Sequence, residues 1–171
     1  MATDKSLRDT RLVFYKDDIE SINAILDAFL KQSAAKCALL IDKDGHMVTS
    51  RGATKRIDLD TISALVAGSF AATREMARIL GEEEFSALYH QGKSDNIQLS
   101  IVGDRALLTA IFDESTTVGM VRLYAAEAAK RLAAIFRKKA QEAVAAGSTA
   151  GEGDATFRTS TGSALDNLFG K

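Results

Sequence analysis

The sequence predicts an α/β domain in which a five-stranded antiparallel sheet is covered by helices on both faces. Segments with helical and strand-like apolar periods follow one another in the order helix, two strands, helix, three strands and helix. Short turns of Gly, Asp, Asn or Ser link neighbouring strands, which favours antiparallel hairpins. The strands are apolar on both faces, so each face of the sheet needs a covering helix.

The first helix and the first hairpin are predicted from residues 16–50. Apolar residues recur at spacings of three and four from Ile19 to Leu30, as in a helix that buries one stripe. We expect this helix to span Asp17–Ser33. The segment KCALLID then predicts a strand covered on both faces, and KDGHMVTS supplies an Asp-Gly turn and a second strand.

The middle of the chain predicts a long helix followed by three strands. IDLDTISALVAGSFAATREMARILG has a helical period, with Asp58 or Asp60 as the N-cap and Gly81 as the stop. FSALYHQG, NIQLSIVG and RALLTAIFD predict the three strands, which turns at KSDN and GDR connect. STTVGMVRLYAAEAAKRLAAIFRKKAQEA then closes the domain as a helix.

The composition changes near the end of the chain, where AAGSTAGEGDATFRTSTG is typical of a flexible linker. We therefore expect four parts. They are a disordered N-terminus over 1–11, a folded domain over 12–141, a flexible linker over 142–162 and a short amphipathic helix over 163–170.

The terminal helix is predicted from SALDNLF. Ser163 is a candidate cap, and Leu165, Leu168 and Phe169 share one helical face. A helix this short is unstable alone in water, so we expect it to form when a groove on a partner accepts that face. The alternative is a disordered end in which the apolar residues occur by chance.

Composition and charge exclude several classes of function. A chain of 171 residues has room for one domain with a core, or for one domain and a tail. Its net charge of −1 creates no field that would attract nucleic acid or an anionic membrane. No apolar run approaches the roughly 20 residues needed to cross a bilayer, and MATDKSLRDTRL lacks the apolar stretch of a signal peptide. We expect a cytoplasmic protein that binds neither nucleic acid nor membrane.

The residues of reactive or metal-binding chemistry are sparse. His46, His90 and the single cysteine, Cys37, have no spacing typical of a metal site, and Cys37 is predicted to be a small core residue. DKDGHMVTS begins like a calcium loop, but Met47 stands where an acidic ligand is needed. The Gly-rich segment near the end lacks the Lys-Ser/Thr of a phosphate-binding loop. We predict no catalytic residue, metal or cofactor, and no enzyme activity of the chain itself.

The middle helix carries more apolar and small residues than one buried face requires. The stripe expected to pack on the sheet consists of Ile62, Leu65, Ser69, Ala72, Met76 and Ile79. A second stripe, almost without bulk, consists of Ala64, Gly68, Ala71 and Glu75. Glycine inside a helix costs roughly 0.5–1 kcal/mol relative to alanine, so Gly68 indicates close approach by another backbone. That backbone belongs either to a partner or to the protein's own sheet.

The order of elements resembles the roadblock family of dynein-light-chain-like proteins. The resemblance covers about Leu12 to Phe136 and is carried by LLIDKDGHMVTSRG, by ISALVAGSFAATREMARILG and by IVGDRALLTAIFD followed by TTVGMVRL. Because of LDNLF at its end, the chain is most similar to the branch of MglB-type regulators, whose partner is a Ras-like small GTPase of the MglA type. The family implies a homodimer built through the middle helix and the edge strand that follows it.

The resemblance also implies which residues make contact. The dimer interface would include Ala64, Gly68, Phe85, Ala87 and Tyr89. The surface that binds the GTPase in its GTP form would include Ala67, Gly68, Ala71, Ala72, Glu75 and Arg78. The terminal helix with Leu165, Leu168 and Phe169 would dock on the GTPase away from the nucleotide.

The function that the resemblance implies is stimulation of GTP hydrolysis by the partner, with a possible second role in nucleotide exchange, in the control of cell polarity or motility at a cell pole. Arg74 and Arg78 are either surface charges or contacts to an acidic partner or a phosphate. Family members reposition residues of the GTPase, which argues against an arginine finger. The alternatives are a roadblock dimer that acts only as a scaffold and, with less support, a ligand-sensing domain.

Overall fold

The computed structural model describes residues 14–169, with side chains described through Ala145. Residues 14–136 form one compact unit, and residues from Arg137 onward belong to a second unit. Among the described residues, no helix combines the length and the apolar character that a membrane span requires.

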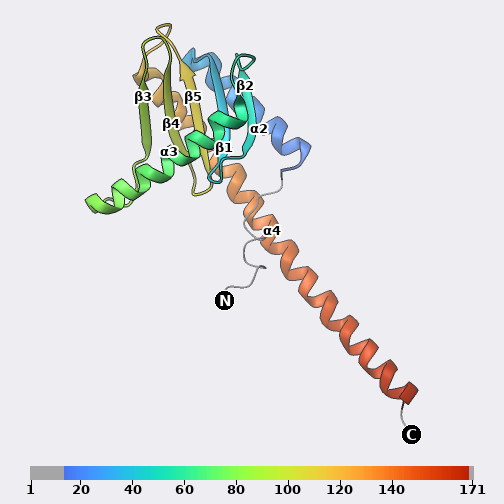
Figure 1. The fold of residues 1–171 in the computed structure, drawn as a ribbon. Coiled ribbons are helices and arrows are strands. Elements are labelled where there is room, and N and C mark those ends of the chain that lie inside the picture. The colour runs from blue at the N-terminus through green and yellow to red at the C-terminus, as the bar shows by residue number, and fades with distance from the viewer. Residues whose placement is uncertain (1–13, 170–171) are drawn as a thin grey trace. The chain divides into compact units, whose positions relative to one another are not determined.

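The first unit is built on a five-stranded sheet with the order β2-β1-β5-β4-β3 (Figure 1). Every neighbouring pair of strands is antiparallel. The strands are β1 Cys37–Asp42, β2 Met47–Gly52, β3 Ala87–Gln91, β4 Asn96–Val102 and β5 Ala106–Phe112. The predicted antiparallel sheet is confirmed, and β3 and β2 are its two edge strands.

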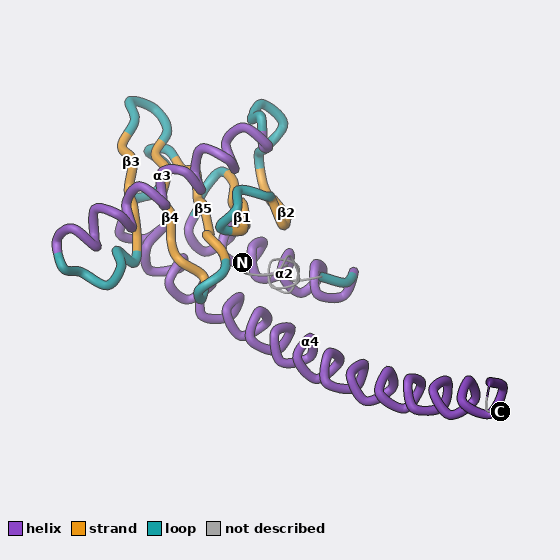
Figure 2. The backbone as a smooth tube through the Cα atoms, turned by 60° about the horizontal axis from the view of Figure 1, so that its bottom comes forward, coloured by secondary structure: helices purple, strands orange, loops and turns teal. Residues whose placement is uncertain are grey.

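Helix α3, Leu59–Leu80, crosses one face of this sheet (Figure 2). Its residues Val66 and Phe70 join alternate side chains of β1, β4 and β5 in a buried apolar cluster. The cluster consists of Cys37, Leu39, Ile41, Val66, Phe70, Leu99, Leu107 and Ile111. Alternation along each strand leaves the remaining strand side chains for the opposite face.

Helix α2, Lys16–Ser33, and the part of α4, Val118–Phe169, that lies in the first unit and ends at Phe136 supply the cover of that opposite face. The hydroxyl of Thr49 in β2 donates a hydrogen bond of 2.8 Å to Oδ1 of Asn23 in α2. The apolar side chains that α2 and α4 bury are Ile22, Ile25, Leu26, Phe29, Val121, Ala125, Ala128, Leu132 and Phe136. The prediction of helices on both faces is therefore confirmed.

The helix boundaries follow from local chemistry. Asp58 is the N-cap of α3, where its Oδ1 accepts a hydrogen bond of 3.1 Å from the backbone N–H of Thr61. Gly81 ends the helix with a φ of 79°, a left-handed conformation that favours glycine. The sequence left Asp58 and Asp60 open as caps, and the structure selects Asp58.

Helix α4 is longer than the sequence predicts. Its backbone is helical to Phe169, through the expected linker over 142–162 and through most of the expected short helix. The chain contains no proline that would stop a helix here, although each glycine in the segment weakens it. The division into linker and terminal helix stays a prediction, and the expected disordered segment 1–11 lies outside the described residues.

Candidate functional site

Helix α3 buries a different stripe from the one expected. The buried residues are Ser63, Val66, Ala67, Phe70, Thr73 and Ala77. Leu65, Met76 and Ile79, which the sequence assigned to the sheet, are 64%, 53% and 71% exposed. That assignment was wrong for these three residues, because it ranked the stripes by bulk, and right for Ile62, which packs against the core.

Two polar residues in the buried stripe also make it harder to recognise from the sequence as the buried side of α3. The hydroxyl of Ser63 donates a hydrogen bond of 2.6 Å to the carbonyl of Leu59. The hydroxyl of Thr73 donates one of 2.9 Å to the carbonyl of Ser69. Both hydroxyls are satisfied within the helix itself, so their burial carries little penalty.

The outward face of α3 is apolar and has no covering element among the described residues. We call this face the α3 surface. It consists of seven exposed residues, which are Ala64, Leu65, Gly68, Ala71, Ala72, Met76 and Ile79. A contiguous apolar face of this kind is typical of an interaction site.

Gly68 lies at the centre of the α3 surface. A Cβ built at this position meets no heavy atom within 4 Å. The protein's own sheet therefore does not crowd Gly68, and the second alternative from the sequence is contradicted. Within one subunit the glycine weakens the helix, and no close contact with a described residue requires it.

The charged residues near the α3 surface pair with each other. Nε of Arg78 donates a hydrogen bond of 3.0 Å to Oε2 of Glu75, and this contact lowers the pKa of Glu75 and raises that of Arg78. Nε of Arg74 lies 3.6 Å from Oε1 of Glu84. Both arginines are thus engaged within their own chain.

Ala67 is not part of the α3 surface. It is 7% exposed, and a Cβ added to Gly45 in the β1–β2 turn would lie 3.5 Å from its methyl group. The other residues expected to contact the GTPase, which are Gly68, Ala71, Ala72, Glu75 and Arg78, are exposed. Ala67 is therefore the least accessible of the expected contacts, because its side chain lies between α3 and the turn, and its contact with the GTPase stays a prediction.

Edge strand β3 pairs with β4 on one side only. Leu88 packs against the core beneath α3, so the alternating neighbours Ala87 and Tyr89 point to the opposite face. The ring of Tyr89 stacks on Phe112 with centroids 6.2 Å apart, and its hydroxyl donates a hydrogen bond of 3.2 Å to Oδ1 of Asn96. Ala87 and Tyr89 therefore lie on the other face of the sheet from Ala64 and Gly68. Phe85, just before β3, is half-buried.

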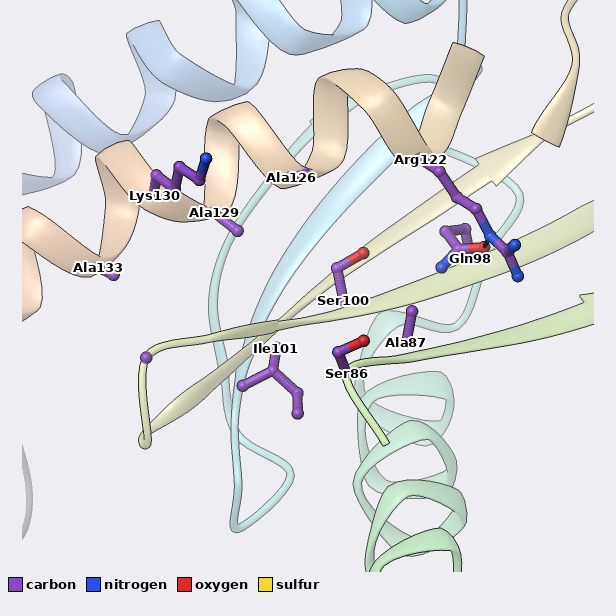
Figure 3. Close-up of a pocket in the computed structure, with 11 residues that line it drawn as sticks. Ser86, Ala87, Gln98, Ser100, Ile101, Arg122, Ala126, Ala129, Lys130 and Ala133 are labelled. Atoms are coloured by element: carbon purple, nitrogen blue, oxygen red, sulfur yellow. Dashed lines mark hydrogen bonds between the residues drawn. The ribbon is translucent and has the colours of Figure 1, made fainter. Parts of the chain in front are cut away.

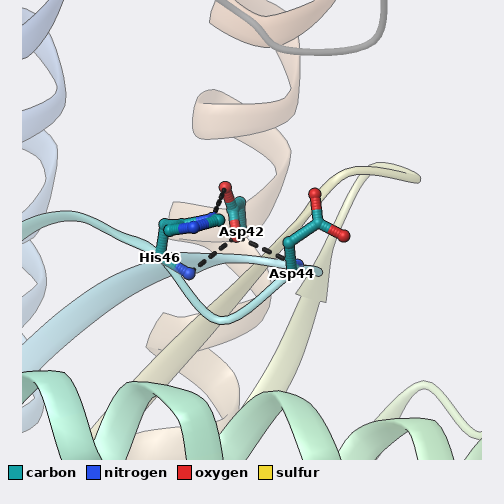
Figure 4. A group of neighbouring side chains, drawn as sticks. All are labelled: Asp42, Asp44 and His46. Carbon is teal, nitrogen blue, oxygen red and sulfur yellow. Dashed lines mark hydrogen bonds and ion pairs between the residues drawn. The ribbon is translucent and has the colours of Figure 1, made fainter. Parts of the chain in front are cut away.

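The β1–β2 turn groups Asp42, Asp44 and His46, whose candidate ligand atoms lie within 4.8 Å of one another (Figure 4). Oδ1 of Asp42 accepts hydrogen bonds from the backbone N–H groups of Asp44 at 3.0 Å and His46 at 2.8 Å. Its Oδ2 lies 3.2 Å from Nδ1 of His46. These contacts stabilise the turn, so the grouping has a structural explanation.

Cys37 is fully buried in β1, and burial raises the pKa of its thiol to about 11. A thiol of this kind is not a nucleophile at neutral pH. The prediction of a small core residue is confirmed.

Leu165, Leu168 and Phe169 lie in the helical backbone at the end of α4, beyond the residues whose side chains are described. Their common face stays a prediction. The exposed Leu65, Met76 and Ile79 are the site residues that the sequence missed. The signal for them was the apolar character of α3 around most of its circumference.

Comparisons with known proteins agree on one family. The chain matches the Roadblock/LC7 domain over residues 22–112, which is more than half of its length. A search of curated proteins finds no match. A Roadblock/LC7 domain from Streptomyces avermitilis shares the fold at 16% identity and a TM-score of 0.57, covering 63% of this chain and 90% of its own.

Three solved MglB structures are more similar, and this chain covers 96% of each. Myxococcus xanthus MglB is 39% identical over 69% of this chain, with a TM-score of 0.67. The gliding protein MglB from Thermus thermophilus is 36% identical over 74%, with a TM-score of 0.71. An MglB in a tetrameric arrangement is 37% identical over 77%, with a TM-score of 0.70. The chain therefore belongs to the Roadblock/LC7 family and, within it, to the MglB proteins.

Proposed function

We propose that this protein is a homodimer that stimulates GTP hydrolysis by a small Ras-like GTPase of the MglA type and so controls cell polarity or motility. The observation that carries the proposal is Gly68, an unfilled position at the centre of an exposed apolar helix face in a member of the MglB group. The family resemblance supplies the GTPase as the partner, and the protein acts in the cytoplasm, at a cell pole.

The proposed dimer joins the part of the α3 surface around Ala64 and Gly68, together with the free edge of β3, to the same parts of a second copy. Small residues such as Ala64 and Gly68 allow two helices to approach closely, and Leu65 and Met76 would lose their exposure to water. Ala87 and Tyr89 lie on the far face of the sheet, so β3 contributes through its backbone edge. Pairing of two such edges would extend the sheet across both subunits.

The proposed GTPase contacts are Gly68, Ala71, Ala72, Glu75 and Arg78. Arg78 is paired with Glu75 and Arg74 with Glu84, so neither guanidinium is free to reach a phosphate without giving up a carboxylate. Both pairs are exposed and weak, so the choice of mechanism follows the family resemblance. We expect the protein to reposition residues of the GTPase rather than to insert an arginine finger, a device worth about 10³ to 10⁵ in rate.

A single-turnover assay of GTP hydrolysis tests the proposal. The purified protein should accelerate phosphate release by an MglA-type GTPase. Ala71→Arg should abolish both binding and acceleration while leaving a folded dimer, because the long cation stands among the proposed GTPase contacts. Ala134→Arg, at an exposed position of α4, is the matched control and should act like the unchanged protein. The double change Arg74→Ala with Arg78→Ala should retain the acceleration to within a factor of about 10.

The assay also distinguishes stimulation of GTP hydrolysis from the alternative function as a scaffold. A scaffold would bind the GTPase without changing its rate of hydrolysis. Equal acceleration by the unchanged protein and by Ala71→Arg would move the contact away from α3. A hundredfold loss of acceleration in the double arginine variant would indicate that one of the arginines acts as an arginine finger.

A further inference from the structure

A cavity of about 590 Å³ opens on the face of the sheet opposite α3, between α4 and strands β3 and β4 (Figure 3). Its volume lies within the range typical of small-molecule sites. One wall is the side of α4 that carries Ala126, Ala129 and Ala133, and the floor is formed by β4 and the start of β3. Small side chains on the helix keep this space open.

A buried amide positions a cation at one end of the cavity. Gln98 is 0% exposed, although it lies in the middle of β4 among apolar neighbours. Its Nε2 donates a hydrogen bond of 3.0 Å to the carbonyl of Leu99, and its Oε1 accepts one of 3.3 Å from Nε of Arg122. Burying an amide is costly unless its hydrogen bonds are made, and here one of those bonds orients Arg122.

The guanidinium of Arg122 keeps donors for a ligand. The bond to Gln98 uses only Nε, and no described carboxylate forms an ion pair with Arg122. Two terminal nitrogens of a guanidinium match the geometry of a carboxylate or a phosphate. Figure 3 shows Arg122 reaching from α4 to the sheet beside Gln98.

The other polar side chains that line the cavity also favour an anionic ligand. Lys130 adds a second positive charge from α4, and no Asp or Glu is among the described residues that line the cavity. The hydroxyls of Ser86 and Ser100 face the same space and hydrogen-bond to no other described side chain or backbone group. A hydroxyl can donate to an anionic oxygen. The alanines of α4 supply an apolar surface beside these groups.

We infer that this cavity binds a small molecule that carries a phosphate or carboxylate group next to an apolar part. The anionic group contacts Arg122 and the serine hydroxyls, and the apolar part lies against Ala126 and Ala129. The inference does not rest on the proposed function, because the cavity lies on the other face of the sheet from the α3 surface.

Titration of the full-length protein, followed by amide NMR shifts at low ionic strength, tests the inference. The probes are phenyl phosphate and benzoate, which distinguish the two anionic groups, and benzyl alcohol, which has the ring without the charge. We expect saturable shifts at Ser100 and Ala126 with at least one anion at millimolar concentration. Benzyl alcohol should bind at least tenfold more weakly.

Variants tie the signal to the cavity. Arg122→Gln should weaken the binding of the anion at least tenfold, and Arg122→Lys should restore part of it. Arg131→Gln removes an exposed charge on α4 that does not line the cavity and should bind like the unchanged protein. An unchanged thermal unfolding midpoint and amide spectrum confirm that each variant is folded. If Arg122→Gln does not fold, Ser100→Val tests the same site.

The inference is overturned if neither anion gives saturable shifts, if benzyl alcohol binds as well as the anions, or if folded Arg122→Gln and Ser100→Val both bind like the unchanged protein. Binding of one anion only supports the inference and identifies the preferred group.

Discussion

At the scale of single residues, the polar side chains buried in the sheet differ in how well they are satisfied. Thr109 lies in the central strand β5, between Leu39 and Leu99 in the register of the sheet. Its Oγ1 is buried without a hydrogen-bond partner among the described residues. Gln98, equally buried, makes two hydrogen bonds. An unpaired buried hydroxyl costs about 1–3 kcal/mol.

Thr109→Val should therefore raise the free energy of unfolding by about 1 kcal/mol, since valine has the same shape and no hydroxyl. Urea unfolding measures the change. Thr49→Val is the matched control: it removes the donor of the bond to Asn23 and should lower stability instead. A loss of stability in Thr109→Val would indicate a bound partner for its hydroxyl.

Asp113 predicts a dependence of stability on pH. Hydrogen bonds from the hydroxyl and backbone N–H of Ser115, assisted by the Lys36 ammonium 3.3 Å away, lower the pKa of Asp113 from 3.8 to about 2. The folded value lies below the unfolded one, so the stabilisation is fully present above pH 3.8 and is lost as the pH falls through about 2.

Asp113→Asn should flatten the decline in unfolding free energy across this acid range. Denaturant unfolding at several pH values measures the slope. Glu114→Gln removes a neighbouring exposed carboxyl without touching Lys36 and should keep the slope of the unchanged protein. An unaltered slope in Asp113→Asn would assign the acid sensitivity to other groups.

At the scale of elements, the sequence predicts which helices and strands form, and in what order, better than it predicts which side of a helix is buried. Helical period and the Asp-Gly turn predict α2, β1 and β2 because each signal is local. Which side of α3 packs on the sheet could not be predicted from a local signal, because apolar and small residues surround most of that helix. Only the side chains of the opposing sheet decide which side is buried. The end of α4 is equally hard to predict, since glycine lowers helix stability without forbidding a helix.

The candidate site was predictable in part for the same reason. Gly68 is visible in the sequence as a glycine within a helical period. The cavity is not, because Gln98 and Arg122 lie 24 residues apart and meet only after α4 folds over β4. Neither residue has a local signal.

Gly68→Leu should shift the protein from dimer to monomer, because the added side chain fills the space that a second copy would occupy. Within one subunit the change should be tolerated, since nothing lies within 4 Å of the added Cβ. Sedimentation velocity at micromolar concentration measures the outcome, with Ala134→Leu on α4 as the control. A dimer that persists in Gly68→Leu would place the interface elsewhere.

The end of α4 carries a separate prediction. Truncation after Ala150 should preserve the dimer and weaken binding to the GTPase, because the apolar residues Leu165, Leu168 and Phe169 are removed. Leu168→Asp in the full-length chain should reproduce the loss, and Asn167→Asp, its neighbour, should not. Calorimetry with the purified GTPase measures the affinity, and equal affinities for all forms would remove this role.

At the scale of the whole first unit, the sheet separates two candidate sites. The α3 surface lies on one face and the cavity beside Arg122 on the other, so a molecule can occupy each at the same time. Strands β3 and β4 both lie between the two sites, because Leu88 and Leu99 pack beneath α3 whereas Ala87 and Gln98 line the cavity.

The open edge of β3 has a further consequence for handling the protein. Natural edge strands usually carry a lysine, a proline or another charge that discourages foreign strands from pairing with them, and ALYHQ contains none of these. A partner strand is then the main protection against unwanted stacking into aggregates. The Gly68→Leu monomer, in which this edge is uncovered, should therefore aggregate more readily than the unchanged protein when both are concentrated.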